Sequence, residues 1–417
     1  MKLFSFLSSW FSKKEELALS FSIDSGKVIG SILGLSRICQ PKILYEVSFS
    51  IPIKDKKPDN IDKYTDDMLK VFERVVFDIY KNGLAHLKFT TFGSRRIKEV
   101  YYTFSSPWCV SQTRIFSLVK PEPVLVTEKL INDFMNEQKK ILESKTEQDL
   151  IDQTQSTSAN PNLQQTKIIE DKVIRVKLNG YFVDQPIGKK AQTIEVVSFM
   201  TLVPQVVFKS IEEMVAKHFV ELKPHTHSFA LAFFSVVRDF FPKEHDSLCI
   251  KVDDEITDIA VIRHGAVVEH ISIPIGNNYV VRTLADKFAT TTETARSVIN
   301  IHKSNDFEKN TGQKVSITTE KAISLWYTTL KDVCVTLAQE LQAPKTVFIL
   351  VKNPEEDHFY NKMKKEKSLY TQNVDEKLSI CPIDVNTLSK QCQIAKMYNN
   401  DTELYVNALF SNKIFQA

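Results

Sequence analysis

The residue types best suited to chemistry gather in the acidic run Asp253-Asp254-Glu255, which closely follows Lys251. Successive carboxylates supply the oxygen ligands that Mg²⁺ or Ca²⁺ takes in proteins. Runs of carboxylates usually face water, however. We therefore expect a solvated turn here in preference to a metal site.

Two histidines, His225 and His227, are the other candidate metal ligands. No Cys or acidic pair stands near them in the sequence to complete a tetrahedral site, so we expect a surface turn before a helix. The chain has no G-x-S-x-G, H-E-x-x-H or G-x-x-x-x-G-K-[ST] motif. Only ten of its 417 residues are glycine, which argues against glycine-rich phosphate loops.

The composition is that of an ordinary globular protein, with 43% hydrophobic and 25% charged residues. The net charge of +3 is too small to indicate nucleic-acid binding. The basic run at residues 362–367 has no interleaved aromatic residues, and we expect a solvated helix face. The six cysteines are scattered and indicate free thiols in a reducing cytoplasm. No apolar run approaches the roughly 18 residues of a transmembrane helix.

The elements that must position the acidic run follow from hydrophobic periodicity. Residues 17–35 and 248–275 each predict a β-hairpin, the second with a tight turn at 263–265. Further strands are predicted at 42–53, 85–92, 98–104, 172–183, 192–202, 346–351 and 377–381. Helices are predicted at 59–82, 127–144, 210–219, 227–239, 279–289, 292–301, 318–341, 358–366 and 401–410. This alternation indicates an α/β protein.

The second hairpin resembles the second phosphate-binding hairpin of the actin-like ATPases, and most closely that of the FtsA cell-division family. That family carries Asp-Ile-Gly-Gly-Gly-Thr-Thr-Asp-Ile-Ala and then Ile-Pro-Ile-Gly-Gly. Thr257, Asp258 and the following Ile-Ala match, as do residues 273–276. The three family glycines fall on Asp253, Asp254 and Glu255, and its metal-coordinating Asp falls on Lys251.

The two other motifs that contact nucleotide in the family are altered as well. In the first hairpin, Ser25 and Lys27 fit the family's Asp-Ile-Gly-Thr-Ala-Lys-Val, but Ser22 replaces its acidic residue and Asp24 its first glycine. The C-terminal Thr-Gly-Gly-Gly is replaced by Val351-Lys352-Asn353. A phosphate cradle needs residues without Cβ so that backbone N–H groups can close around it. The resemblance therefore implies an actin-like fold in which ATP and Mg²⁺ binding is lost.

The resemblance also implies how the chain is divided. Asn179-Gly180-Tyr181 and Pro186-Ile187-Gly188 match a turn in the strand–helix–strand–strand subdomain inserted in the FtsA and PilM branch of this fold. We expect a two-lobed, ribonuclease H-like α/β architecture. The expected parts are an amphipathic segment (1–16), a first lobe (17–96 and 206–244), an inserted subdomain (97–205) with a polar mobile loop (145–166), and a second lobe (245–417) with a helical subdomain at about 279–341.

The resemblance implies that the protein is a non-enzymatic scaffold of bacterial cell division. Its implied partners are an FtsZ-like tubulin homologue or other division proteins, with self-association left open and no nucleic acid. Its implied location is the cytoplasm, on the inner face of the cell membrane. The alternative is a PilM-like cytoplasmic component of type IV pilus assembly, built on the same fold. An ATPase that tolerates divergent loops is a third hypothesis, against which Lys251 and the acidic run argue.

The first fourteen residues predict a membrane anchor. In a helix, six large apolar residues fall within one arc of roughly 160° while Lys and Ser residues fill the opposite side. The apolar set is Leu3, Phe4, Phe6, Leu7, Trp10 and Phe11. FtsA proteins carry such an anchor at the C-terminus, whereas here we expect residues 401–410 to be the last helix of the fold. Docking of this segment on protein is the alternative.

We expect the change of both Trp10 and Phe11 to Glu to release the protein from anionic liposomes. Lys2, Lys13 and Lys14 should each add about 1 kcal/mol of attraction near an anionic surface, and salt should weaken it. Sedimentation with vesicles measures the loss. If the double variant pellets as fully as the parent protein, the apolar stripe packs on protein instead.

Overall fold

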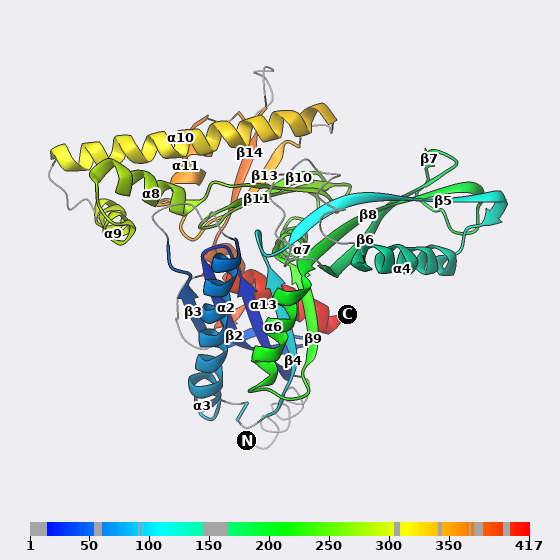
Figure 1. Ribbon diagram of the computed structural model, residues 1–417, viewed down its shortest axis with the longest axis horizontal. Coiled ribbons are helices and arrows are strands. Elements are labelled where there is room, and N and C mark those ends of the chain that lie inside the picture. Colours follow the sequence, from blue (N-terminus) through cyan, green and yellow to red (C-terminus); the bar gives the residue numbers. More distant parts are fainter. Residues whose placement is uncertain are drawn as a thin grey trace, which may run out of the picture.

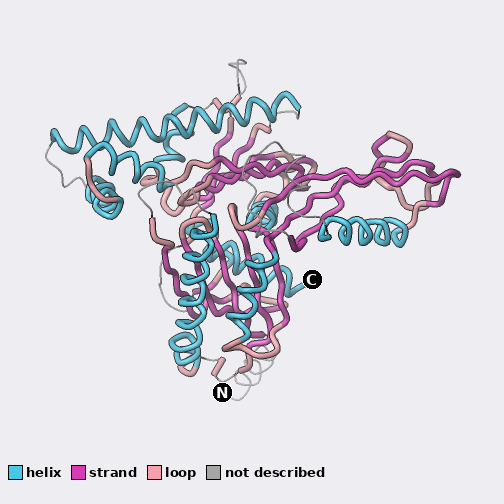
Figure 2. The backbone as a smooth tube through the Cα atoms, viewed as in Figure 1, coloured by secondary structure: helices cyan, strands magenta, loops and turns pink. Residues whose placement is uncertain are grey.

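The computed structural model describes residues 15–53, 61–90, 92–93, 95–144, 166–303, 309–340, 344–366, 368–370, 378–394 and 401–417. Three β-sheets organise these residues (Figures 1 and 2). Two of them form the cores of two lobes, and the third projects sideways as an arm. The predicted α/β class is confirmed.

The first lobe is built on a six-stranded sheet with the strand order β15-β3-β2-β1-β4-β9. Its strands are β1 (Glu15–Ile23), β2 (Lys27–Ser36), β3 (Lys42–Ser50), β4 (Ile97–Phe104), β9 (Lys223–Ser228) and β15 (Gln393–Ile394). Strands β1, β4 and β9 run parallel, so their carboxyl ends meet at one edge of the sheet. The first predicted hairpin is β1 with β2, joined by the short turn 24–26.

The second lobe is built on a five-stranded sheet with the order β12-β11-β10-β13-β14. Its strands are β10 (Ser247–Val252), β11 (Thr257–Arg263), β12 (Ala266–Ile273), β13 (Thr346–Leu350) and β14 (Ser379–Ile383). The tight turn predicted between β11 and β12 lies at His264-Gly265, where both residues have positive φ. That backbone suits a two-residue hairpin turn. The two predicted hairpins therefore lie in different sheets.

Helices separate and cover the two sheets. Helices α2 (Ile61–Asp78) and α6 (Gln205–Ala216) pack on the outer face of the first sheet. Helices α7 (Phe229–Phe240) and α13 (Thr402–Gln416) lie between the sheets, in a core that both share. Helices α8 (Asn277–Phe288), α10 (Lys309–Glu340) and α11 (His358–Glu366) cover the far face of the second sheet, with α9 (Thr292–Lys303) beside α8.

The arm is a four-stranded sheet with one helix, seen at the right in Figure 2. It contains β5 (Val110–Leu125), α4 (Glu128–Ser144), β6 (Thr166–Leu178), β7 (Tyr181–Phe182) and β8 (Lys190–Pro204). Its core lies between the sheet and α4. Buried Glu170 of β6 ties the arm to the first lobe by accepting hydrogen bonds from the backbone N–H and the hydroxyl of Ser228, at 3.0 and 2.6 Å. The predicted mobile loop 145–166 lies, except for Thr166, outside the described residues.

Two domain boundaries differ from those predicted. Strand β4 pairs with β1 along its length, so residues 97–104 belong to the first lobe and the arm starts at β5. At the other end, β15 pairs with β3 and α13 packs on β1 and β2, so the chain returns to the first lobe after β14. Hydrophobic periodicity identifies each element but does not state which sheet it joins, which is why both boundaries were misplaced.

Two element types also differ. The segment 85–92 was predicted as a strand, but α2 continues through a π-helical turn (Ile79–Gly83) into α3 (Leu84–Leu87), which buries Leu87. His225 and His227 were predicted in a surface turn, but both lie in β9. The His225 ring stacks on Tyr101 of β4 at 4.6 Å. The remaining short helices are α12 (Val385–Leu388) and a 3₁₀ turn (Ser389–Gln391). Within the described part of the chain, no helix is both long and apolar enough to cross a bilayer.

Candidate functional site

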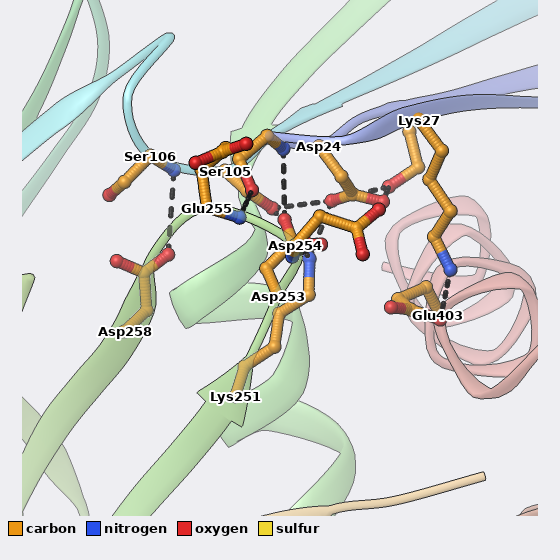
Figure 3. Close-up of polar contacts among 12 residues, drawn as sticks. Asp24, Lys27, Ser105, Ser106, Lys251, Asp253, Asp254, Glu255, Asp258 and Glu403 are labelled. Atoms are coloured by element: carbon orange, nitrogen blue, oxygen red, sulfur yellow. Dashed lines mark hydrogen bonds and ion pairs between the residues drawn. The ribbon is translucent and has the colours of Figure 1, made fainter. Parts of the chain in front are cut away.

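The turns of the two predicted phosphate hairpins meet face to face between the lobes (Figure 3). The β1–β2 turn and the β10–β11 turn both stand at the carboxyl ends of parallel strand pairs. The backbone N–H of Ser25 donates to the Asp253 carboxylate at 2.9 Å. In return, the backbone N–H of Glu255 donates to the Ser25 hydroxyl at 3.0 Å. Each turn therefore donates a backbone hydrogen bond to a side chain of the other turn.

Lys251 lies at the centre of this contact. Its ammonium group lies 2.6 Å from the Asp24 carboxylate, 3.0 Å from the Ser105 hydroxyl and 3.4 Å from the Asp253 carboxylate. The Lys251 side chain is 3% exposed, and that of Asp24 is fully buried. Ser22 and Ser105 also donate hydrogen bonds to Asp24, and the ring of Phe229 on α7 lies 4.3 Å from the ammonium nitrogen. A cation and a carboxylate from different lobes thus share one dry site.

The ammonium of Lys251 stays charged in this site. Burial lowers the pKa of Lys251, but the nearby carboxylates of Asp24 and Asp253 more than compensate, and the pKa lies above its usual range. An uncompensated charge in such a dry place would cost far more than the pair does. Lys251 can therefore be buried because it forms an ion pair with Asp24.

Lys27 forms a second ionic link, between β2 and the start of α13. Its ammonium lies 2.8 Å from Asp401 and 3.1 Å from Glu403. Burial lowers the pKa of Lys27, while Glu403 and Asp401 raise it well above its usual range. Both carboxylates lie at the N-terminus of α13, where the helix dipole favours negative charge. The lysine predicted from the first hairpin therefore holds the last helix of the chain.

Asp254 occupies the tightest position in the acidic run. A Cβ added to Gly26 would lie 2.0 Å from the Asp254 carboxylate, so the turn of the first hairpin leaves space for this side chain only because it carries a glycine. Burial raises the pKa of Asp254 to about 6, and the neighbouring Asp253 adds to the rise. Its nearest cation, Arg296, is 3.9 Å away. Asp254 is thus the least compensated carboxylate of the run.

Glu255 is held by helix α8. Arg282 contacts both Glu255 oxygens, at 2.9 and 2.6 Å, and the Asn278 amide donates to one of them at 2.8 Å. The backbone N–H groups of Asn277 and Asn278 donate to the carbonyls of Asp253 and Asp254. A Cβ added to Gly276 would lie 2.3 Å from the Asp253 carbonyl oxygen, so only glycine permits this approach. The start of α8 therefore closes over the acidic turn.

The two residues that match the family motif, Thr257 and Asp258, continue the hydrogen-bonded network. The Thr257 hydroxyl donates to the Ile275 carbonyl and accepts from the Trp326 indole of α10. Asp258 accepts from the Ser272 hydroxyl at 2.7 Å and from the Ser106 backbone N–H at 3.4 Å. Ser106 belongs to the first lobe, so Asp258 also bridges the lobes.

The third predicted stretch, Val351-Lys352-Asn353, follows β13, which pairs with β10 so that Leu350 lies opposite Lys251. Val351 is buried and donates from its backbone N–H to Ile383. Lys352 and Asn353 line an open cavity of about 480 Å³ together with Pro354, Glu356, Asp357, Val385 and Asn386. None of the residues around this cavity belongs to the two hairpin turns. The third motif therefore starts at the same edge of the second sheet as the acidic turn, while the cavity that it lines is formed with other residues.

The expectation of a solvated acidic turn is wrong for Asp253 and Glu255, while the Asp254 side chain stays 22% exposed. Asp253 is 5% exposed and Glu255 is 7% exposed, because cations and N–H donors from β10, α8 and the first hairpin surround them. Among the described residues no cluster of three or more His, Cys, Asp or Glu side chains has the arrangement of a metal site. The predicted membrane-contacting residues in the first fourteen positions lie outside the described part. Sequence reasoning missed the residues that complete the network: Ser105, Asn278, Arg282, Asp401 and Glu403.

We expect Asp254→Asn to stabilise the protein at pH 7.5 and to have little effect at pH 4. The pKa of Asp254 is raised in the folded state, so ionising this carboxyl costs folding free energy above pH 6 and nothing below pH 4. The amide carries no charge, and the gain at pH 7.5 should be about 1–3 kcal/mol. Urea unfolding at the two pH values measures it. Asp286→Asn, on the exposed face of α8, is the matched control and should change little at either pH. A loss of stability at pH 7.5 in the Asp254 variant would contradict this account.

The sequence matches no family model and no curated protein. Among solved structures, the chain is similar to one described as a PilM-PilN type IV pilus biogenesis complex, with a TM-score of 0.59 and 9% identity over 95% of this chain and 96% of that chain. A Bacteroides thetaiotaomicron protein described as having an actin-like ATPase fold follows with a TM-score of 0.40, 10% identity and coverage of 96% and 98%. EutJ of Carboxydothermus hydrogenoformans has a TM-score of 0.41, 9% identity and coverage of 94% and 89%. At these identities the likeness concerns the fold alone, and the fold of this chain is the two-lobed actin-like fold.

Proposed function

We propose that this protein is a nucleotide-independent scaffold, an actin-like fold whose cleft is closed by its own side chains. The observation that carries the proposal is the contact between the two hairpin turns. The Ser25 backbone N–H donates to the Asp253 carboxylate, and Lys251 pairs with Asp24. The donors and charges that would hold a phosphate and its metal already have partners within the chain.

The chemistry of the cleft opposes ATP binding at each step. A phosphate cradle needs free backbone N–H donors and a carboxylate that holds a cation. The Asp253 carboxylate takes the Ser25 donor, and the Asp254 side chain fills the space beside Gly26. The Lys251 ammonium stands where the family carries its metal-coordinating Asp, and its positive charge repels a divalent cation. Phosphate hydrolysis therefore has neither a binding site nor a metal ligand here.

A scaffold at the membrane is the role that suits such a closed fold. In this proposal the first fourteen residues hold the protein to the inner surface of the cell membrane, and the rest of it recruits other proteins in the cytoplasm. Division proteins, with an FtsZ-like tubulin homologue first among them, are the partner class favoured by the FtsA-type turn at Asn179-Gly180-Tyr181. Self-association is compatible with this role.

A PilM-like part in type IV pilus assembly is the second candidate function. The likeness to a PilM-PilN complex structure favours it, because that solved structure spans nearly the same length as this chain. Both candidates share the fold, the closed cleft and the membrane surface. They differ in the partner alone.

We expect MgATP to leave the thermal stability of the protein unchanged. A ligand at about 100 times its dissociation constant stabilises the folded state by about 2.7 kcal/mol. About 1 mM MgATP would therefore reveal binding with a dissociation constant of about 10 µM or lower. Thermal unfolding with and without MgATP, followed by calorimetric titration, measures it. Micromolar affinity in the titration would overturn the proposal of nucleotide independence.

We expect the protein to co-sediment with filaments of the tubulin homologue of the same cell. Protein with the Trp10→Glu and Phe11→Glu changes serves as the control, since removal of the anchor should not affect binding to filaments. Binding instead to the membrane protein of a pilus assembly operon, with no co-sedimentation, would replace the division role by the pilus role.

A further inference from the structure

One end of the first lobe carries an apolar and basic surface that neither the cleft nor the arm uses. Strands β1, β4 and β9 run parallel and start at this end, and β2 turns into β3 there. The loops that lead into these strands therefore lie together, at the lower end of the lobe beside α3 in Figure 1. We call this surface the base and define it by residues 37–40, 88–96 and 217–222, of which 91 and 94 are not described.

The base exposes large apolar side chains from three separate loops. Phe89 is 89% exposed, Val220 is 69% exposed and Ile38 is 56% exposed. Between the second and third loops lies a groove of about 370 Å³ whose lining is mainly apolar and includes Leu84, Leu87, Phe219 and Leu222. Val220 lines this groove and Phe89 directly follows Lys88 of its lining, so exposed apolar side chains and an apolar groove lie together, as at interaction sites.

The base is also rich in basic residues. Its three loops contain Arg37, Lys88, Arg95, Arg96 and Lys217 but a single carboxylate, Glu221, whereas the whole chain has a net charge of only +3. Glu221 is already paired with Arg96 at 2.6 Å, and Lys217 lies 3.6 Å from Glu73 of α2. At the start of β1, Glu15 is paired with Lys42 and Glu16 with Lys98. Lys88 has no acidic partner among the described residues. The surface thus presents positive charge around exposed apolar side chains.

The position of the base relative to the predicted anchor identifies the partner. Strand β1 begins at Glu15, and the Arg95 guanidinium of the base donates to the Glu15 carbonyl at 3.3 Å. The fourteen residues with the apolar stripe and three lysines immediately precede that point. A bilayer that takes up this stripe must lie close to the base. Positive charge around protruding Phe and aliphatic side chains is the chemistry that anionic lipid binds.

We propose that the base is a second membrane-contact surface, which inserts Phe89 and Val220 at the headgroup boundary of an anionic bilayer while its Lys and Arg side chains contact the lipid phosphates. This inference rests on the proposed location of the scaffold at a membrane. It adds that the first lobe meets the bilayer end-on. Helix α10 would then lie at the end away from the lipid and the arm would project sideways, both open to protein partners (Figure 1). A short anchor alone binds marginally and leaves the orientation free, whereas two contacts bind more tightly and fix it.

The test is sedimentation of the full chain with vesicles of phosphatidylglycerol and phosphatidylethanolamine, and with phosphatidylcholine vesicles for comparison. The Phe89→Glu and Val220→Glu double variant should bind the anionic vesicles at least tenfold more weakly than the parent. Both side chains are exposed, so the changes leave the core intact. The matched control is the Ile317→Glu and Leu325→Glu double variant, which introduces the same charge at exposed positions of α10 and should bind like the parent. Lys88→Glu should weaken binding to anionic vesicles and leave binding to phosphatidylcholine unchanged.

A second measurement reports the contact directly. Cys39 in the base is exposed, Cys381 is half-buried and the other four cysteines are buried. In a Cys381→Ser protein, an environment-sensitive fluorophore on Cys39 should shift to the blue when anionic vesicles are added. A control fluorophore at Ile317→Cys, in protein that also carries Cys39→Ser, should not shift.

The outcomes separate this inference from the proposed function. If the parent binds anionic vesicles, the base variant binds equally well and the Cys39 fluorophore does not shift, the base makes no membrane contact and the anchor acts alone. If the base variant loses binding and the Trp10→Glu, Phe11→Glu variant keeps it, the base is the membrane surface and the proposed anchor is wrong. A parent that fails to bind any anionic vesicle overturns both.

Discussion

The ion pair between Lys251 and Asp24 is the contact on which the relation of the two lobes depends. Removal of both groups from water costs several kcal/mol for each charge, and only a short, fully hydrogen-bonded pair offsets that cost. The 2.6 Å contact, the Ser105 hydroxyl and the Asp253 carboxylate provide those conditions. Loss of one partner would leave a buried charge alone and would cost about 3–5 kcal/mol. The pair therefore fixes how closely the two hairpin turns approach.

The same constraint explains why three successive carboxylates are tolerated beside the pair. Asp253 shares Lys251, and Glu255 has Arg282 in a bidentate contact. At Asp254 the charges of Lys27 and Arg296 oppose the effects of burial and Asp253 only in part, and the pKa rises to about 6. The excess negative charge is thus concentrated on one side chain, which can bind a proton. A second carboxylate without a cation in the same turn would leave two unpaired negative charges close together at neutral pH, and these would repel each other.

Hydrophobic periodicity was sufficient to predict the strands that frame the cleft, because β1, β2, β10 and β11 are buried and apolar along most of their length. It was not sufficient to predict which side chains complete the site. Lys27 pairs with Asp401, which lies 374 residues later in the chain, and the sequence around either residue does not predict the pairing. The acidic run was misjudged for the same reason. Whether a carboxylate is solvated depends on the cations that the rest of the fold places beside it. Arg282, which pairs with Glu255, lies on helix α8, and the sequence of the acidic run does not indicate that this helix packs against it.

The strands and the hairpin turns contribute to different parts of the structure, which explains how the fold is retained without the family's phosphate-binding glycines. The two sheets are stabilised by the helical layers on their faces, and no residue of the hairpin turns contributes to those apolar cores. The turns are constrained where the lobes touch and where α8 covers the acidic turn, and there the requirement is compensated charge and close approach. A Cβ at Gly26 or at Gly276 would collide with the acidic turn, so both positions require glycine. In the proposed scaffold the contact between the hairpin turns therefore holds the two lobes together. Other molecules then bind at the outer surfaces, such as the arm and the base of the first lobe.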